Sequence, residues 1–431
     1  MINTKDEVIK YFNSGFKENK NFKIGIEHEK FLFDNKNNRR IDYFKVKEMF
    51  SALIEFGWNP IFEKDNIIGL NKSGKNITLE PGNQIELSGD KLNNIHEGCA
   101  ESQNYLFELR QVTKKLGINI VSAGFDPISK LNEIPNNPKQ RYKLMTKSMP
   151  LGGSLSLDMM YRTCGTQINL DYSSEEDFIK KFKVINSIVP ITIALFANSS
   201  IVEKKKTSYL SYRSKVWQNT SRGGLPKIFF DDLDFEKYAD FIINFPILFI
   251  QDESKYISGK NYRFSDFMNG EIKEINNRLP SEKDLSTHLS TIFTENRLKK
   301  YIEIRSMDTC GWDCLCSGPA FFVGILYGNL NEVYELISEW DKDKIINAYL
   351  EAPHKGFNTQ LMGKDLLYWA SVLLELSKKG LEKRDILNKS KKNETIFLNH
   401  IQKVIENKTT NADHMINKFS KNEDLKVLYD K

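Results

Sequence analysis

Four segments of the chain alternate hydrophobic and polar residues with a period of two, which predicts β-strands. They span residues 23–31, 78–88, 162–171 and 300–306. Residues two apart in a strand point to the same side, so each segment has one aliphatic face and one polar face. A sheet with one solvated face explains any single segment. Four such faces that are poor in lysine and rich in acid, amide and arginine groups predict a shared site.

The polar faces carry the side chains that bear the chemistry. In chain order these are Glu27 and Glu29, then Glu80, Gln84 and Glu86, then Gln167 and Asn169, and finally Glu303 and Arg305. Glu80 comes just before a Pro-Gly bend, whereas His28 points away from its acidic neighbours and is predicted to be structural. If the strands are neighbours, the glutamates converge.

Helical periodicity fills most of the remaining chain. A helix is predicted over 94–116, with Gly117 as its stop, and another after Ser173, with Glu176 three positions on in a capping-box pattern. From residue 319 onward the chain reads as helical, over 332–349, 364–379 and 395–406. The prediction is therefore an α+β fold, with residues 1–431 as one catalytic domain and a helical portion over about 319–431.

Composition narrows the class of protein. Of the 431 residues, 40% are hydrophobic and 28% are charged, which is ordinary for a globular protein. The net charge of +5, from 62 basic and 57 acidic residues, does not indicate nucleic-acid binding. The most apolar windows, 188–197 and 319–327, are much shorter than the roughly 20 residues needed to cross a bilayer. With no signal-peptide pattern, we expect a cytoplasmic protein without a membrane partner.

Five cysteines in a chain of this length predict reduced thiols rather than a disulfide scaffold. Three of them, Cys310, Cys314 and Cys316, form a short cluster. Its spacing, three residues and then one, is not typical of a zinc ribbon or finger.

Converging glutamates repel one another, so either their pKa values rise or cations bind between them. Hard oxygen ligands without a matching His or Cys set favour magnesium, with manganese as the alternative. A magnesium site of this kind indicates a substrate that carries phosphate groups. Because the sequence contains neither a GxxxxGK[ST] loop nor a GxGxxG motif after a strand, the residues predict metal-bridged ATP on a sheet.

These segments resemble the plant-type glutamate–cysteine ligases, which also occur in proteobacteria. The matching motifs, within about residues 20–330, are GIEHEKF at 25–31, LEPG at 79–82, ELSG at 86–89, LDMMYRTC at 157–164, LSYRSKVW at 210–217, HLSTIF at 288–293, 297–305 and PAFFVG at 319–324. The resemblance implies a glutamine-synthetase-like fold, in which an antiparallel sheet forms a cradle with surrounding helices.

The resemblance also implies the reaction. ATP phosphorylates the side-chain carboxylate of L-glutamate, and the amine of L-cysteine then displaces phosphate from the γ-glutamyl phosphate. The product is γ-glutamylcysteine, the first intermediate of glutathione biosynthesis. Both steps develop negative charge on oxygens, which metal ions and arginines stabilise.

By the same resemblance, individual residues receive roles. Magnesium is assigned to Glu27, Glu29, Glu80, Glu86 and Glu303, and Gln84, Gln167 and Asn169 are candidate cofactor-binding residues. Arg305 should contact the transferring phosphate. Arg162 and Arg213 are expected to bind substrate carboxylates, whereas Trp217 is expected to pack. Cys99 and Cys316 occupy positions that resemble a redox-active disulfide of the plant enzymes. The sequence leaves undecided whether these two cysteines form a disulfide.

Four points remain open from the sequence. A relative that joins glutamate to another amine would share the acyl-phosphate half of the reaction, and the product could feed another thiol such as ergothioneine. A non-catalytic binding or regulatory homologue is disfavoured, because all five glutamates and the three arginines are present. A monomer and a homodimer are both compatible with the sequence.

Overall fold

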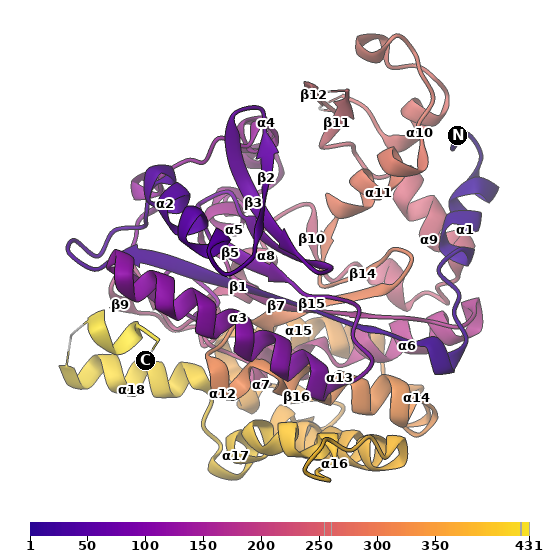
Figure 1. Ribbon diagram of the computed structural model, residues 1–431. Coiled ribbons are helices and arrows are strands. Elements are labelled where there is room, and N and C mark those ends of the chain that lie inside the picture. The colour runs from indigo at the N-terminus through magenta and orange to yellow at the C-terminus, as the bar shows by residue number, and fades with distance from the viewer. Residues whose placement is uncertain (254, 260, 423–424, 431) are drawn as a thin grey trace.

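The architecture is a large antiparallel sheet with helices against it, as a computed structural model describes for residues 1–253, 255–259, 261–422 and 425–430. The strands of this sheet, in spatial order, are β14 (Asn296–Leu298), β15 (Ile302–Asp308), β7 (Gly165–Leu170), β1 (Ile24–Asp34), β5 (Ile85–Ser88), β4 (Lys75–Leu79), β3 (Asn66–Lys72) and β2 (Asn59–Glu63). Strand β6 (Ile118–Val121) pairs with the far end of β1. The long strand β1 crosses the middle of the molecule in Figure 1.

The four sequence segments with polar faces do become neighbours, because β5, β1, β7 and β15 are consecutive in the sheet and each pair is antiparallel. Two details differ from the prediction. Segment 78–88 is a hairpin in which β4 ends at Leu79 and β5 starts at Ile85. In segment 162–171 the strand begins only at Gly165, and Arg162 is the last residue of a helix.

The helices cover the aliphatic face of the sheet and the edges of its polar face. They are α1 (Lys5–Asn13), α2 (Tyr43–Ile54), α3 (Ile95–Leu116), α4 (Gln140–Ser148), α5 (Ser156–Arg162), α6 (Glu175–Ser187), α7 (Val189–Leu195), α8 (Tyr212–Trp217), α9 (Phe235–Ile243), α10 (Phe264–Met268), α11 (Glu282–Ser290), α12 (Trp312–Leu315), α13 (Ser317–Val323), α14 (Leu330–Ile337), α15 (Lys342–Lys355), α16 (Leu366–Arg384), α17 (Asn399–Asn407) and α18 (Asn411–Asn422).

Shorter elements connect them. The 3-10 turns are η1 (Asn19–Asn21), η2 (Leu131–Glu133), η3 (Met149–Gly152), η4 (Lys227–Phe230), η5 (Lys273–Ile275), η7 (Gly356–Asn358), η8 (Glu394–Leu398) and η9 (Leu425–Leu428), and η6 (Gly324–Gly328) is π-helical. The small strand pairs are β8 (Ile201–Val202) with β9 (Lys205–Lys206), β10 (Gly223–Gly224) with β13 (Phe293–Thr294), β11 (Phe249–Asp252) with β12 (Lys255–Ser258), and β16 (Gln360–Leu361) with β17 (Lys364–Asp365).

The main hydrophobic core lies against the aliphatic face of the sheet. Ile26, Ile168 and Ile304, from three neighbouring strands, are buried there with residues of α6, α7, α13 and α16. The carboxyl-terminal helices α16 and α17 lie beneath the sheet in Figure 1. Burial of this apolar surface fixes the strand register, because a shift of one residue would turn Glu27 and Glu29 into the core.

The α+β prediction is confirmed, with small shifts in the helices. Helix α3 has Asn94 as its N-cap and Gly117, at a φ of 66°, as its C-cap. The capping pair of α6 is Ser174 with Asp177, one residue later than the predicted Ser173 and Glu176. The predicted 332–349 helix is two helices, α14 and α15, and residues 423, 424 and 431 of the predicted helical region lie outside the described residues. No helix in the described part of the chain combines the length and apolarity required to span a membrane.

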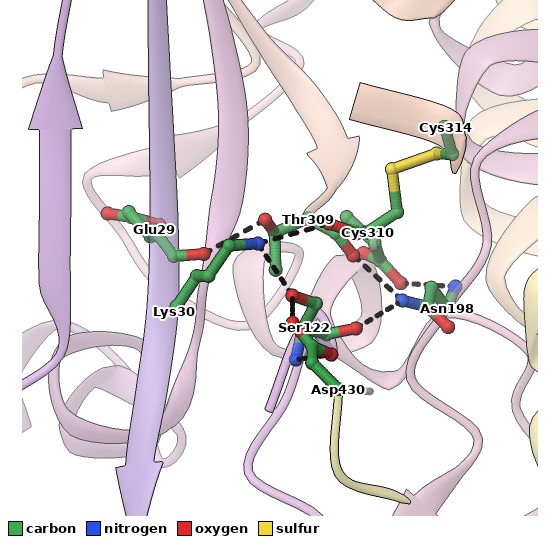
Figure 2. Close-up of a disulfide and its surroundings, with 9 residues drawn as sticks. Glu29, Lys30, Ser122, Asn198, Thr309, Cys310, Cys314 and Asp430 are labelled. Atoms are coloured by element: carbon green, nitrogen blue, oxygen red, sulfur yellow. Dashed lines mark hydrogen bonds between the residues drawn. A yellow bond between two sulfur atoms is a disulfide. The ribbon is translucent and has the colours of Figure 1, made fainter. Parts of the chain in front are cut away.

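The cysteines correct one prediction. Cys310 and Cys314 form a disulfide just after β15, so the expectation of reduced thiols is wrong for this pair (Figure 2). Cys99 and Cys316 are free in the structure, but their thiols are in hydrogen-bond contact. That contact lowers the pKa of Cys99 and, together with burial, raises the pKa of Cys316.

Candidate active site

A cavity of about 410 Å³ lies over the polar face of β5, β1, β7 and β15. Helices α4, α5, α8 and α11 and the hairpin β11–β12 contribute its walls. Its charged lining residues are the carboxylates Glu27, Glu29, Glu80, Glu86 and Glu303 and the cations Arg141, Arg297, Lys299 and Arg305. All five glutamates that the sequence singled out therefore meet in one cavity.

Four of the glutamates crowd together on the floor. Glu29 on β1 stands directly opposite Glu86 on β5, and Glu27 stands opposite Gln167 on β7. Like charges directly across an antiparallel pair repel. Burial, followed by repulsion from Glu86 and Glu303, raises the pKa of Glu27 to about 7. Burial and Glu80 raise the pKa of Glu86 to about 7 as well.

Glu29 is the most strongly affected of these groups. Burial, followed by the charges of Glu86 and Glu80, raises its pKa well above the usual range. The backbone N–H of Gly165 donates a hydrogen bond to its carboxylate and partly opposes this effect. The floor is thus short of positive charge around Glu29, which is the condition that a bound cation would relieve.

Glu303 has a different environment. Arg297 Nε donates to its carboxylate, and Lys299 Nζ lies 2.9 Å from it. Burial opposes its ionisation, but Arg297, Lys299 and Arg305 outweigh that effect and hold its pKa below the usual range. The charge of Glu303 is therefore already balanced by protein groups, unlike that of Glu29.

Arg305 lies on the floor beside the glutamates, as the strand alternation predicts. Its Nη1 donates to the side-chain oxygen of Gln167, and its guanidinium carbon is 5.3 Å from the centre of the Trp217 ring. Burial lowers its pKa to about 10, so it stays charged at neutral pH. Its Nε is buried and has no hydrogen-bond partner among the described residues.

Trp217 is a wall of the cavity as well as a packing residue. Two guanidinium groups lie near its ring: the guanidinium carbon of Arg213 is 4.8 Å from the ring centre, and that of Arg305 is 5.3 Å from it. Arg213 itself is buried behind the floor, where its Nη2 donates to the backbone oxygen of Arg305 at 2.8 Å. Arg213 supports the floor from that position. It is not one of the described residues that line the cavity.

The structure places Arg162 and Asn169 outside the described cavity lining too. Arg162 pairs with Asp158 at 2.8 Å and with Glu203 at 3.3 Å, and it lies over the ring of Phe125. Asn169 Nδ2 donates to Glu27 Oε1 at 2.7 Å, so it orients a glutamate. In this arrangement Arg162 already has protein carboxylates as partners.

Gln84 lines the cavity, but its amide is used by the protein. Its Nε2 donates to the carbonyl oxygens of Met160 and Thr163, both at 3.2 Å, and its Oε1 accepts from the N–H of Gly82 at 2.8 Å. These bonds fix the bend that presents Glu80. We interpret Gln84 as a residue that shapes the site.

Sequence reasoning missed three cations of the cavity. Arg141 comes from α4, which no strand pattern marks, and its Nη2 donates to the hydroxyl of Tyr142 at 2.9 Å. Arg297 lies on β14 and Lys299 just after it, before the turn into β15. A strand period of two would have placed Arg297 and Lys299 on one face, but the run 296–299 is too short to show it.

The donor set fits a hard divalent cation held jointly with phosphate. In the described part of the chain, no group of three or more His, Cys, Asp or Glu side chains is arranged to hold a metal ion alone. Magnesium is usually bound through one or two carboxylates, with water and substrate phosphates completing its shell. The crowded pairs Glu29–Glu86 and Glu86–Glu80 supply such carboxylates.

The raised pKa values predict how pH affects stability. A carboxyl whose folded pKa is about 7 takes up protons on folding, so its stabilising contribution is present at low pH and lost as pH rises through about 7. We expect the melting temperature of the metal-free protein to fall between about pH 6 and about pH 8, and magnesium to raise it more at the higher pH. Scanning calorimetry at both pH values measures this. An equal magnesium effect at the two values would contradict it, and Glu86→Gln should flatten the metal-free slope.

A sequence profile of glutamate-cysteine ligase family 2 matches residues 23–431. The chain belongs to this family. The match continues past residue 330, where the recognised motifs end, so the carboxyl-terminal helices are part of the family's sequence.

Individual relatives of the family agree over almost the whole chain. The chain is 40% identical over 419 residues to a chloroplastic glutamate–cysteine ligase of Nicotiana tabacum, covering 96% of this chain and 79% of the relative. It is 38% identical over 423 residues to a chloroplastic glutamate–cysteine ligase of Arabidopsis thaliana, covering 97% of this chain and 80% of the relative.

A solved structure supports the fold independently. A glutamate–cysteine ligase of Francisella tularensis, crystallised in complex with AMP, superimposes with a TM-score of 0.53 at 15% sequence identity. The superposition covers 93% of this chain and 85% of that one. The prediction of a glutamine-synthetase-like sheet cradle is confirmed.

Proposed function

We propose that the protein ligates the side-chain carboxylate of L-glutamate to the amine of L-cysteine at the expense of ATP, giving γ-glutamylcysteine. One observation carries the proposal: in a chain of this family, five glutamates and Arg305 meet on the polar floor of one cavity. A carboxylate-lined floor with adjacent cations suits phosphoryl transfer, which depends on positioning and charge neutralisation.

In the first step, an oxygen of the glutamate side chain attacks the γ-phosphorus of ATP, and ADP leaves with the electrons of the broken bond. Arg305, which lines the floor of the cavity, neutralises charge on the transferring phosphoryl group. Arg141, which lines the wall and keeps only Tyr142 as its hydrogen-bond partner among the described residues, is placed to bind a substrate carboxylate.

In the second step, the amine of cysteine attacks the acyl carbon and inorganic phosphate leaves. Part of the cavity wall is apolar and soft, formed by Met145, Met159, Met160, Trp217, Phe249 and Phe293. Aromatic rings make favourable contacts with sulfur, and methionine side chains adapt to the shape of a bound group. This wall supports cysteine as the amine substrate.

Magnesium, or manganese, would be held by Glu27, Glu29, Glu80 and Glu86 together with the phosphates, and it would neutralise charge on those phosphates. Glu303, whose charge Arg297 and Lys299 already balance, would be the weakest member of this set. Gln167 and Asn169 then act by orienting Arg305 and Glu27, respectively.

The proposals for domain organisation, pathway, location and oligomeric state are those that the sequence suggests. One hydrophobic cluster extends from Ile2 to Val404, which supports a single catalytic domain. The product would enter glutathione biosynthesis. A cytoplasmic location and a monomer or homodimer remain predictions, and the relatives named above are chloroplastic.

The direct test is ADP release by the purified protein with magnesium, ATP and glutamate, with cysteine, serine, alanine or glycine added in turn. We expect release to depend on cysteine, and mass spectrometry to detect γ-glutamylcysteine in the same samples. Equal ADP release with the other amines would show that the enzyme does not select cysteine. No ADP release with any amine would contradict the ligase assignment.

A further inference from the structure

Lys30 is a buried lysine directly behind the floor of the cavity. It follows Glu29 on β1, so the alternation of the strand sends Glu29 into the cavity and Lys30 to the opposite side, where it is 1% exposed. Its Nζ donates to Ser122 Oγ at 2.6 Å and to the backbone oxygen of Cys310 at 3.2 Å (Figure 2). No substrate can reach it from the cavity side, because the sheet intervenes.

A negative charge from the other end of the chain is linked to Lys30 through Ser122. Ser122 donates from its backbone N at 3.1 Å and from its Oγ at 2.5 Å to the carboxylate of Asp430. The backbone N–H of Asp430 donates to the oxygen of Ile120 on β6 at 2.8 Å. The segment 425–430 is thereby fastened beside β6, which is itself paired with β1.

The same network holds the peptide of Glu29. Thr309 Oγ1 donates to the backbone oxygen of Glu29 at 2.9 Å. Asn198 Nδ2 donates to the backbone oxygens of Thr309 and Ser122, both at 2.8 Å, and so joins the Thr309 side to the Ser122 side. Figure 2 shows these bonds linking Glu29 and Lys30 to Asn198 through Thr309 and Ser122, with the Cys310–Cys314 disulfide next to them.

We propose that Lys30 and Asp430 are positioning residues of the active site: through Ser122 they fix the β1 peptide that carries Glu29. This rests on the proposed function, in which Glu29 binds magnesium. A buried ammonium group needs an opposite charge and hydrogen-bond acceptors. Without the charge of Asp430, Lys30 leaves its place, and the strand can no longer hold Glu29 opposite Glu86.

The test is Asp430→Asn in the full chain. Replacing a group that orients a metal ligand typically weakens metal affinity or activity by 10- to 100-fold. We expect the free magnesium concentration for half-maximal ADP release to rise about tenfold. The affinity for Mn²⁺ in the presence of ADP, measured by electron paramagnetic resonance, should weaken by a similar factor, while the KM for cysteine stays the same.

Asp413→Asn is the matched control. Asp413 also lies near the carboxyl end, where its carboxylate accepts from the N and Oγ1 of Thr410 at 2.8 and 2.7 Å, and no described contact joins it to Lys30. We expect it to lower the melting temperature without changing the magnesium requirement. A second variant, Lys30→Met, should match the Asp430→Asn defect, and the double variant should be no worse than Lys30→Met alone.

The outcomes separate the two proposals. If wild-type protein forms no γ-glutamyl product, the proposed function fails. If wild-type protein is active and Asp430→Asn changes neither the magnesium requirement nor Mn²⁺ binding, the positioning role is wrong. It is also wrong if Asp413→Asn raises the magnesium requirement as much, because the effect is then general loosening of the carboxyl-terminal segment.

Discussion

Glu27→Gln is expected to lower kcat by roughly 10²- to 10³-fold while the protein stays folded. Glutamine keeps the size of the side chain and can still accept the hydrogen bond from Asn169 Nδ2, but it removes one of the crowded negative charges. The variant loses a carboxylate for metal and phosphate, and it also loses repulsion from Glu86 and Glu303. The metal-free variant should therefore melt at a higher temperature than wild type at about pH 8.

The opposite signs of these two effects make the test sharp. Steady-state kinetics and calorimetry on the same preparation measure both. Glu55→Gln, at the exposed end of α2, is the control and should change neither. Retained turnover in Glu27→Gln would remove Glu27 from the metal site, and a lower melting temperature would contradict the repulsion on which its pKa depends.

Arg305→Lys is expected to lower kcat by roughly 10²- to 10³-fold, with a smaller effect on the KM for cysteine. Lysine keeps the positive charge but loses the planar guanidinium that bonds Gln167 and stacks on Trp217. The charge on the transferring phosphoryl group would then meet a cation of the wrong shape and position.

Single-turnover measurement of ADP formation with ATP and glutamate, but without cysteine, isolates the phosphoryl-transfer step. The defect of Arg305→Lys should appear there in full. Arg384→Lys is the control, because Arg384 is a partly buried arginine that pairs with Glu394 and belongs to the carboxyl-terminal helices. Normal phosphoryl transfer in Arg305→Lys would overturn the role of Arg305.

The strand pattern predicted much of the site because its period is a local property. Glu27, Glu29 and Arg305 were placed on polar faces by alternation alone, and all three line the cavity. The convergence of the strands was a conditional expectation, which the antiparallel order of β5, β1, β7 and β15 confirms.

Local pattern could not show which partner a charged side chain chooses. Arg162 and Arg213 belong to recognised motifs, yet Arg162 pairs with Asp158 and Glu203, and Arg213 lies behind the floor. Glu303 looks like the other glutamates in sequence, but Arg297 and Lys299 give it a depressed pKa. The disulfide partner of Cys310 was equally undetermined.

The sequence by itself therefore determined the polar-faced strands, the family and the class of chemistry, because side-chain periodicity and motifs are written in neighbouring residues. The tertiary structure decided which carboxylates lack a cation, that Arg141 on a helix joins the cavity, and that Asp430 is linked to Lys30 through Ser122. Those outcomes depend on packing between segments as far apart as residues 122 and 430, where burial and the distances between charges set the energies.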